Sequence, residues 1–244
     1  MHMIPPAALA DLLATPTAAP PPIEATVRRL WARRARFGIT RLGALTGLDR
    51  AGVPVAQVIR PLARSNAVTQ GKGATLPEAA IAALMESLET WAAERIPPER
   101  TWRAPPDDTD LWADLCRRAP DPAASIAWIE GWDLLAARPR PVPLALVDTV
   151  YTLPSPHPAW LPRDTSGLAA GTDLQGALRH ACLELLEREA RHRALAMPHF
   201  FDRFRIAAAS VAGARSAPLL DRLRRSPASG ASRLRTACRS TGAT

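Results

Sequence analysis

Residues 73–89, GATLPEAAIAALMESLE, decide the fold of this 244-residue chain, because a second copy of them follows. Residues 171–187, GTDLQGALRHACLELLE, align with them at a shift of 98 positions without a gap, and seven of the seventeen residues are identical. Each copy has a glycine, then Thr75 or Asp173 as a helix cap, then a helix with Glu-x-x-Glu. Thr75 and Glu78 also have capping-box spacing. The pattern predicts an internal duplicated turn–helix, with the second helix over residues 174–195.

Both predicted helices place glutamates beside an apolar stripe. At about 100° per residue, Glu86 and Glu89 border the stripe of the first helix, and His180, Glu184 and Glu187 line up beside that of the second. Carboxylates at the edge of a core repel one another and lose hydration, and a divalent metal would offset both effects. The alternative, that each pair marks an ordinary solvated helix face, stays open.

The second helix has further leucines around its glutamates. Leu183, Leu185 and Leu186 widen its apolar surface, so we expect this helix to be buried over most of its girth and water to be largely excluded from Glu184. Glu94, on the other side of the first helix, serves as the control position, where replacement by Gln should change ligand binding little.

Composition narrows the class of protein. The formal net charge is +8, but residues 201–244 contain nine Arg and two Asp and so carry +7 of it. The first 200 residues are therefore nearly neutral, which argues against nucleic-acid binding by this part of the chain. No run approaches the roughly 20 apolar residues of a membrane span, and the N-terminus is a poor signal peptide. Three widely spaced cysteines, Cys116, Cys182 and Cys238, indicate reduced thiols. We expect a cytoplasmic protein without membrane or nucleic-acid partners.

Three segments are expected along the chain. Residues 1–22 read as a flexible Pro/Ala-rich leader, residues 23–225 as one domain, and residues 226–244 as a basic tail that is either naturally disordered or frameshifted, and that should not pack on the core. Strands are predicted on both sides of the turn at 46–52 and over residues 125–134 and 142–150, with a short helix near 111–117. The fold class is α+β, a mostly antiparallel sheet packed with helices. His157, His192 and His199 lack metal-ligand spacing and receive no role.

A Gly-Lys-Gly sequence at residues 71–73 precedes the first repeat helix. Glycines let a backbone approach a phosphate, Lys72 supplies charge, and the helix N-terminus favours an anion. An exposed turn lysine is the competing interpretation, and the sequence is not a Walker A loop.

Taken together, several motifs resemble those of the YcaO domain family. They are ITRLGALTGLDRAGVPV at 39–55, Arg60-Pro61, GKG at 71–73, ALMESLE at 83–89, SGLAAG at 166–171 and HACLELLERE at 180–189. The opening motif looks most like the branch that occurs alongside TfuA proteins. Members usually continue for about a hundred residues or more beyond the second helix, so the resemblance implies a C-terminally truncated, incomplete domain.

The resemblance implies an ATP- and Mg²⁺-dependent enzyme that activates backbone amides of a ribosomally made peptide by O-phosphorylation, giving azolines by cyclodehydration or thioamides. Glu86, Glu89, Glu184 and Glu187 match the family's metal-binding glutamates. Lys72, Ala82, His180 and Arg188 match its ATP-binding positions. Ala82 replaces a serine and His180 a common glutamine, so one hydroxyl is lost and one hydrogen-bonding group is kept. No catalytic residue is assigned.

The resemblance also implies partners: a precursor peptide or protein substrate, a TfuA-like protein and a homodimer. Two other functions remain open. A truncated, inactive YcaO-like chain could act as a partner- or leader-peptide-binding module. A carboxylate-bridged di-iron protein is the weaker alternative, because that class needs Glu-x-x-His and neither Glu86 nor Glu184 has a histidine three residues on.

Overall fold

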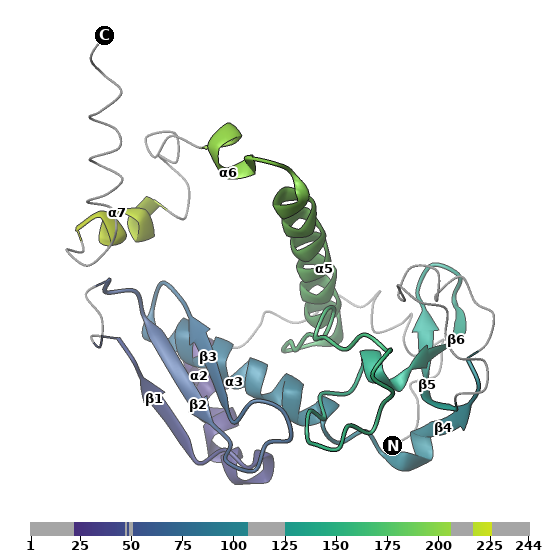
Figure 1. Ribbon diagram of the computed structural model, residues 1–244. Coiled ribbons are helices and arrows are strands. Elements are labelled where there is room, and N and C mark those ends of the chain that lie inside the picture. The colour runs from purple at the N-terminus through teal and green to yellow at the C-terminus, as the bar shows by residue number, and fades with distance from the viewer. Residues whose placement is uncertain (1–21, 47, 49–50, 107–124, 206–216, 226–244) are drawn as a thin grey trace. The chain divides into compact units, whose positions relative to one another are not determined.

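The computed structural model describes residues 22–46, 48, 51–106, 125–205 and 217–225 (Figure 1). Two three-stranded antiparallel sheets, with strand orders β1-β2-β3 and β4-β5-β6, combine with helices. The expected α+β class with antiparallel sheets is therefore confirmed. Among the described helices, none is both long and apolar enough to span a membrane.

The elements follow in chain order. They are α2 (Ile23–Ala32), a 3₁₀ turn (Arg34–Phe37), β1 (Arg41–Ala44), β2 (Val55–Ile59), β3 (Val68–Lys72), α3 (Leu76–Ala93), a 3₁₀ turn (Pro98–Arg100), β4 (Thr101–Ala104), β5 (Ile126–Asp133), β6 (Arg138–Pro143), a 3₁₀ turn (Leu144–Leu146), α5 (Leu174–Ala196), α6 (Phe200–Arg203) and α7 (Ala217–Arg225). The predicted strands around residues 46–52 and the predicted helix over 174–195 correspond to β1, β2 and α5.

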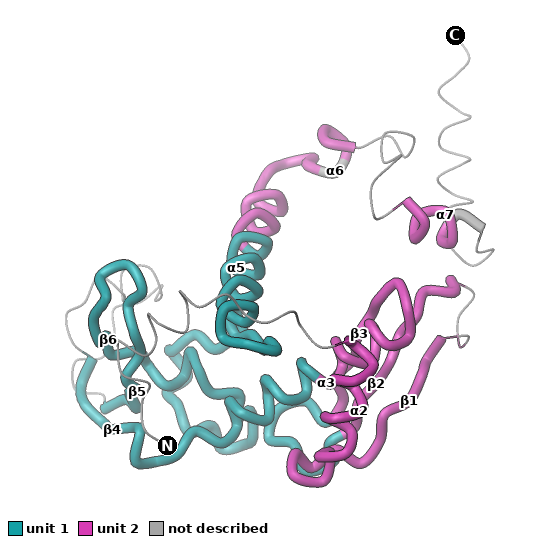
Figure 2. Tube along the Cα trace, turned by 180° about the vertical axis from the view of Figure 1, so that it is seen from behind, with its two compact units in different colours: residues 1–21, 60–67, 85–188 teal, residues 22–59, 68–84, 189–244 magenta. Residues whose placement is uncertain are grey.

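The chain divides into two compact units (Figure 2). One comprises residues 1–21, 60–67 and 85–188, and the other residues 22–59, 68–84 and 189–244. Both α3 and α5 are divided by this boundary, so the second half of α3 and most of α5 belong to the first unit. Each unit has its own sheet and its own buried core.

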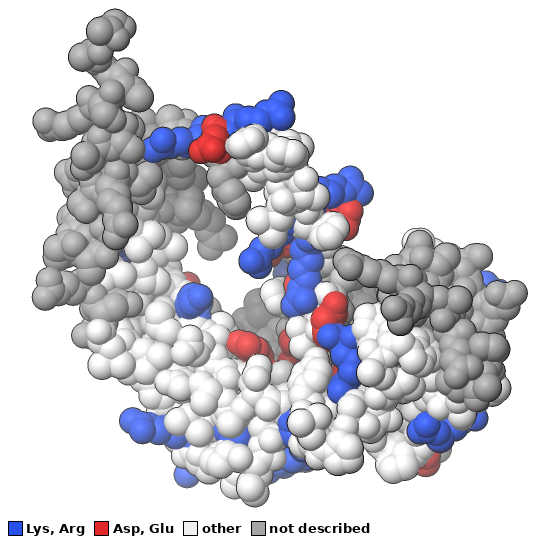
Figure 3. Space-filling model, in the orientation of Figure 1, with Lys and Arg blue, Asp and Glu red and all other residues white. Residues whose placement is uncertain are grey.

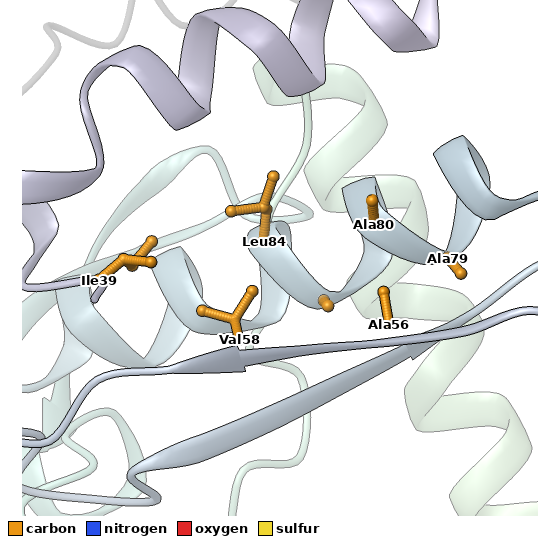
Figure 4. Close-up of a cluster of buried hydrophobic side chains, with 7 residues drawn as sticks. Ile39, Ala56, Val58, Ala79, Ala80 and Leu84 are labelled. Carbon is orange, nitrogen blue, oxygen red and sulfur yellow. The ribbon is translucent and has the colours of Figure 1, made fainter. Parts of the chain in front are cut away.

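In the unit that holds β1, β2 and β3, the sheet packs on the first half of α3. Ala56 and Val58 point from β2 toward α3 (Figure 4) and are each 1% exposed. They join the buried set Ile39, Ala79, Ala80, Ala83 and Leu84, against which α2 contributes Val27, Leu30 and Trp31. This apolar contact is the main stabilising feature of the unit.

The third strand of this sheet, β3, was not predicted. It pairs antiparallel with β2, with Ala56 opposite Gly71 and Val55 opposite Lys72. A Cβ at Gly71 would lie 2.2 Å from both Ala79 O and Ala83 N, so only glycine lets β3 approach α3 this closely. The close approach of β3 to α3 therefore explains the first glycine of the GKG sequence. Lys72 is an exposed strand residue rather than part of a turn.

The other sheet corrects a predicted strand boundary. The strand expected over residues 142–150 is β6 (Arg138–Pro143), and a 3₁₀ turn follows it. Pro139, Pro141 and Pro143 lie opposite alternate residues of β5. Because β6 is an edge strand, prolines at every second position can direct their missing N–H away from the ladder. The apolar residues that follow the prolines were assigned to the strand in their place, and the boundary was therefore misplaced.

The two repeat segments begin their helices in the same way. The helices start at Leu76 and Leu174, which are equivalent positions. The predicted capping box is confirmed: Glu78 N donates to Thr75 Oγ1 at 3.4 Å, and Thr75 N donates to Glu78 Oε2 at 3.3 Å. In the second copy Gly176 N donates to Asp173 Oδ1 at 2.7 Å. That the copies arose by duplication stays a prediction.

Other expectations fall on residues that the structure does not describe. These are the leader up to residue 21, the short helix near 111–117 and the basic tail at 226–244. The domain boundaries inferred from sequence therefore stay predictions.

Candidate functional site

Within the unit that contains residues 85–188, the second half of α3 faces a cavity of about 680 Å³. Its lining is mainly apolar and includes Met85, Leu88, Ala92, Ile129, Val147 and Leu168. Glu89 is a charged member of this lining, together with Arg100 and Asp173. The site thus combines an apolar hollow with one half-buried glutamate on α3.

Glu89 lies in an unfavourable environment for a charged carboxylate. Burial raises its pKa most, repulsion from Glu184 and Glu86 raises it further, and together they bring it to about 7. A hydrogen bond from the Ala170 backbone and the charge of Arg188 partly oppose this. Glutamates from α3 and α5 therefore influence one another within one region. The convergence of all four glutamates, Glu187 included, stays a prediction.

Arg188 links α5 to the loop before it. Its Nη2 lies 2.5 Å from Glu184 Oε1, one helical turn earlier. Its Nη1 donates to Ser166 Oγ at 2.9 Å and its Nη2 to Thr165 Oγ1 at 3.0 Å. The guanidinium is thus held by one carboxylate and two hydroxyls while its side chain stays 42% exposed, so it can still contact an anionic ligand.

Acidic and basic side chains lie side by side along α5 (Figure 3). Glu189 pairs with Arg193 at 2.5 Å, in the same i,i+4 spacing as Glu184 and Arg188. The two pairs differ in burial: the Glu189 side chain is 54% exposed and that of Glu184 is 24% exposed. Glu189 is therefore a matched reference position for Glu184.

The donor set fits Mg²⁺ together with a phosphate ligand better than a closed protein cage. Among the described residues, no group of three or more His, Cys, Asp or Glu is close enough to hold a metal ion alone. Mg²⁺ usually takes only one or two carboxylates, and phosphate oxygens and water complete its shell. Half-buried Glu89, with Glu86 and Glu184 acting on it, has the oxygen chemistry and the excess negative charge that such an ion would offset.

Four other described residues were expected to contact the metal or the nucleotide, and the structure does not link them to Glu89. Glu187 and His180 are exposed on α5. Lys72 and Ala82 belong to the other compact unit, Lys72 at the end of β3 and Ala82 on the first half of α3. The roles of these four residues stay predictions.

The expected burial of α5 is wrong. No residue of this helix is buried, and Leu183, Leu185 and Leu186 are 58%, 48% and 66% exposed. These leucines do not exclude water from Glu184. Periodicity identifies which residues share a face, but burial also requires a second surface to cover that face.

Glu94 is a poor control position, because its side chain is buried in an ion pair. Glu94 is 1% exposed, and its Oε1 and Oε2 accept hydrogen bonds from Arg60 at 2.7 and 3.0 Å. Ser65 Oγ donates to the same carboxylate at 2.6 Å. Burial alone would raise the pKa of Glu94, but the hydrogen bonds from Arg60 and Ser65 outweigh it and lower the pKa to about 2. The partner is 34 positions away, so the helix pattern gave no sign of it.

A second buried polar cluster was also missed. His157, which received no role, is 6% exposed, and its Nε2 lies 2.6 Å from Asp148 Oδ2. Arg163 Nη2 donates to Asp148 Oδ1 at 2.7 Å. The available signal was Asp148 itself, an aspartate within the apolar sequence LALVDTV, since a carboxylate there must find a partner.

Comparisons with known proteins bear on the family of this chain. The family model for the YcaO cyclodehydratases, described as ATP- and Mg²⁺-binding, matches residues 70–230. The expected cofactors, ATP and Mg²⁺, agree with that description. An uncharacterized protein of Methanothermobacter thermautotrophicus is 34% identical over 170 residues, which are 68% of this chain and 44% of that protein. An uncharacterized protein in the tfuA 3′ region of Rhizobium leguminosarum bv. trifolii is 36% identical over 165 residues, covering 63% and 38%.

Solved structures show a similar fold. YcaO from Methanopyrus kandleri, solved with AMPPCP and Mg²⁺, matches with a TM-score of 0.56 and 28% identity over 72% of this chain and 45% of that one. A heterocyclase in complex with substrate and cofactor matches with a TM-score of 0.53 at 20% identity, covers 67% of this chain and 28% of that one, and supports the fold alone. The chain thus spans less than half the length of these relatives. By the extent of the family match, this chain belongs to the YcaO family.

Proposed function

We propose that this chain binds Mg-ATP at the second half of α3 and the middle of α5, and that it serves the activation of a peptide backbone amide. The observation that carries this proposal is the electrostatic coupling of Glu89 with Glu86 and Glu184 beside Arg188. The family model and the AMPPCP-bound relative support it.

The residues divide the work as follows. One or two of Glu89, Glu86 and Glu184 would hold Mg²⁺ together with phosphate oxygens, and the bound ion would neutralise charge on the triphosphate. Arg188, already oriented by Ser166 and Thr165, would donate to a phosphate oxygen in its planar fork. Glu187, His180, Ala82 and Lys72 are proposed as further contacts on the strength of the family pattern.

The chemistry suited to such a site is transfer of the γ-phosphoryl group of ATP. A thiol, hydroxyl or sulfide adds to an amide carbonyl and gives an oxyanion. That oxygen attacks the γ-phosphorus, and ADP leaves. Phosphate then leaves from carbon in place of hydroxide, which is a poor leaving group. The product is an azoline or a thioamide, depending on the nucleophile, in a ribosomally made precursor peptide.

A TfuA-like protein is proposed as a partner because a relative lies in a tfuA 3′ region. A second candidate function is a peptide-binding module without turnover. Mg-ATP binding alone distinguishes a retained nucleotide site from a module that has lost it, and release of phosphate in the presence of peptide distinguishes an active enzyme from an inactive one.

The test is Glu184→Gln, measured by calorimetric titration with Mg²⁺ and AMPPCP. Gln keeps the shape and helix propensity of Glu but removes its charge, so we expect at least about tenfold weaker binding, or about 1.4 kcal/mol. Glu189→Gln is the matched control and should change the affinity less than about twofold. Equal small effects would mean that both glutamates belong to solvated faces and would contradict the proposal.

A further inference from the structure

The loop between β6 and α5 supplies several of the contacts at the proposed nucleotide site. Thr165 and Ser166 accept hydrogen bonds from Arg188, and the Ala170 backbone donates to Glu89. These three residues lie in a segment without helix or strand. The positions of loop side chains depend on the contacts that hold the loop in place. The contacts that hold this segment therefore determine how well the site is organised.

A buried charged cluster anchors the loop from within. Asp148 is 5% exposed and binds both His157 and Arg163, with one carboxylate oxygen for each. Arg163 Nη2 also donates to the Val150 carbonyl at 2.7 Å, and its guanidinium lies 4.6 Å from the centre of the Tyr151 ring. The three charged or titratable groups thus connect residues at the start and in the middle of the loop.

The start of the loop is fixed in turn to the end of α3. Thr149 is fully buried, and its Oγ1 donates to the Thr90 carbonyl at 3.1 Å. Tyr151 N donates to the Arg64 carbonyl at 2.9 Å. Asp148 is therefore followed in the chain by a residue that is hydrogen-bonded to the helix that carries Glu89.

Only one residue separates Arg163 of the buried cluster from Thr165, the first loop residue that contacts Arg188. Arg163 is followed by Asp164, whose Oδ1 accepts from Ser166 N at 2.7 Å. Leu168 N then donates to the Thr165 carbonyl at 3.1 Å. The segment is a chain of tight local turns, so a displacement of Arg163 is passed on to Thr165 and Ser166.

We propose that Asp148, His157 and Arg163 are positioning residues of the nucleotide site: they hold residues 165–170 so that Arg188 and Glu89 receive their loop contacts before ligand arrives. This inference rests on the proposed function. Its physical basis is preorganisation, because supporting groups that orient ligand-contacting side chains can be worth about 10- to 100-fold in affinity.

The first test uses the protein without nucleotide. In Asp148→Asn, amide hydrogen exchange of residues 165–170 should accelerate at least about tenfold, while amides of β1, β2 and β3 stay unchanged. Asp133→Asn is the control, because Asp133 also holds a turn, through Leu135 N and Ala136 N, and also pairs with an arginine, but lies outside the cluster. Unchanged exchange at residues 165–170 in Asp148→Asn would overturn the inference and leave the proposed function untouched.

The second test is a double-mutant cycle on the dissociation constant for Mg²⁺ and AMPPCP. Asp148→Asn and Arg188→Gln should each weaken binding about tenfold, and the double variant should be no more than about twofold weaker than Arg188→Gln alone, since one acts through the other. If the two effects instead multiply, so that the double variant binds about a hundredfold more weakly than the wild type, the cluster only stabilises the fold and does not act through Arg188. Wild-type protein with a protected loop but no nucleotide binding would overturn the proposed function and, with it, this positioning role.

A graded pair of variants covers the case in which Asp148→Asn does not fold. Arg163→Lys keeps a charge for Asp148 and should retain nucleotide affinity within about threefold, whereas Arg163→Gln should lose about tenfold. Equal affinity in the two variants would contradict the proposal.

Discussion

The two Glu-x-x-Glu helices begin alike but are buried very differently. In α3, Ala79, Ala83 and Leu84 are fully buried and Ser87 is 1% exposed, whereas α5 has no buried residue. Both helices nevertheless start three residues after a glycine and one after a capping residue. The comparison teaches that a repeated sequence reproduces local structure, because capping and turn chemistry are local, whereas burial depends on what else reaches the helix.

The largest expected effect separates Glu94, which directly follows α3, from Glu189 within α5. Glu94→Gln leaves Arg60 buried and short of its counter-charge, so we expect a loss of about 4 kcal/mol in the free energy of unfolding. Glu189→Gln on α5 breaks only an exposed pair and should cost less than about 0.5 kcal/mol. Urea denaturation of both variants measures the difference, and similar costs would contradict the difference in burial between the two carboxylates.

The same carboxylate predicts how stability depends on pH. The pKa of Glu94 is lowered from 4.5 to about 2 in the folded chain, so between these pH values the unfolded state binds more protons. Its contribution is present above pH 4.5 and is lost as the pH falls toward 2. Unfolding titrations should show a shallower loss of stability in this window for Glu94→Gln than for the wild type. Parallel curves would exclude Glu94 as the source.

A smaller effect compares leucines on the two apolar stripes. Leu84→Ala opens a cavity beside Val58 and Ile39 and should destabilise the protein by about 3 kcal/mol. Leu186→Ala, at a position that is 66% exposed, should cost less than about 0.5 kcal/mol. Thermal unfolding distinguishes the two. A large cost at Leu186 would mean that a surface in solution covers the α5 stripe.

The smallest expected effects concern the glycines, where the two copies should behave alike. A Cβ at Gly73 would lie 2.5 Å from Glu78 Cβ, and one at Gly171 would lie 2.6 Å from Ala177 N. We therefore expect both Gly73→Ala and Gly171→Ala to cost about 1–3 kcal/mol through displaced helix starts. Circular dichroism melts provide the comparison, and a neutral result at one position alone would break the local equivalence of the copies.

The sequence by itself determined the parts that rest on short-range rules. The caps at Thr75 and Asp173, the starts of α3 and α5, and the hairpin of β1 and β2 follow from local residue chemistry. The family followed from ordered motifs, and with it came the expectation that Glu86, Glu89, Glu184 and Arg188 act together. Each of these signals lies within a few neighbouring residues or within a motif of fixed spacing.

Only the tertiary structure decided which of these surfaces are covered and which charges are paired. Glu94 meets Arg60 across 34 positions, and Gly71 meets α3 through backbone atoms that no residue pattern encodes. Leu186, which the sequence pattern predicted to be buried, is exposed because no other part of the described chain covers it. Helical periodicity fixes the direction of a side chain about its own axis, but the free energy of burying it depends on a partner that arrives from elsewhere in the chain.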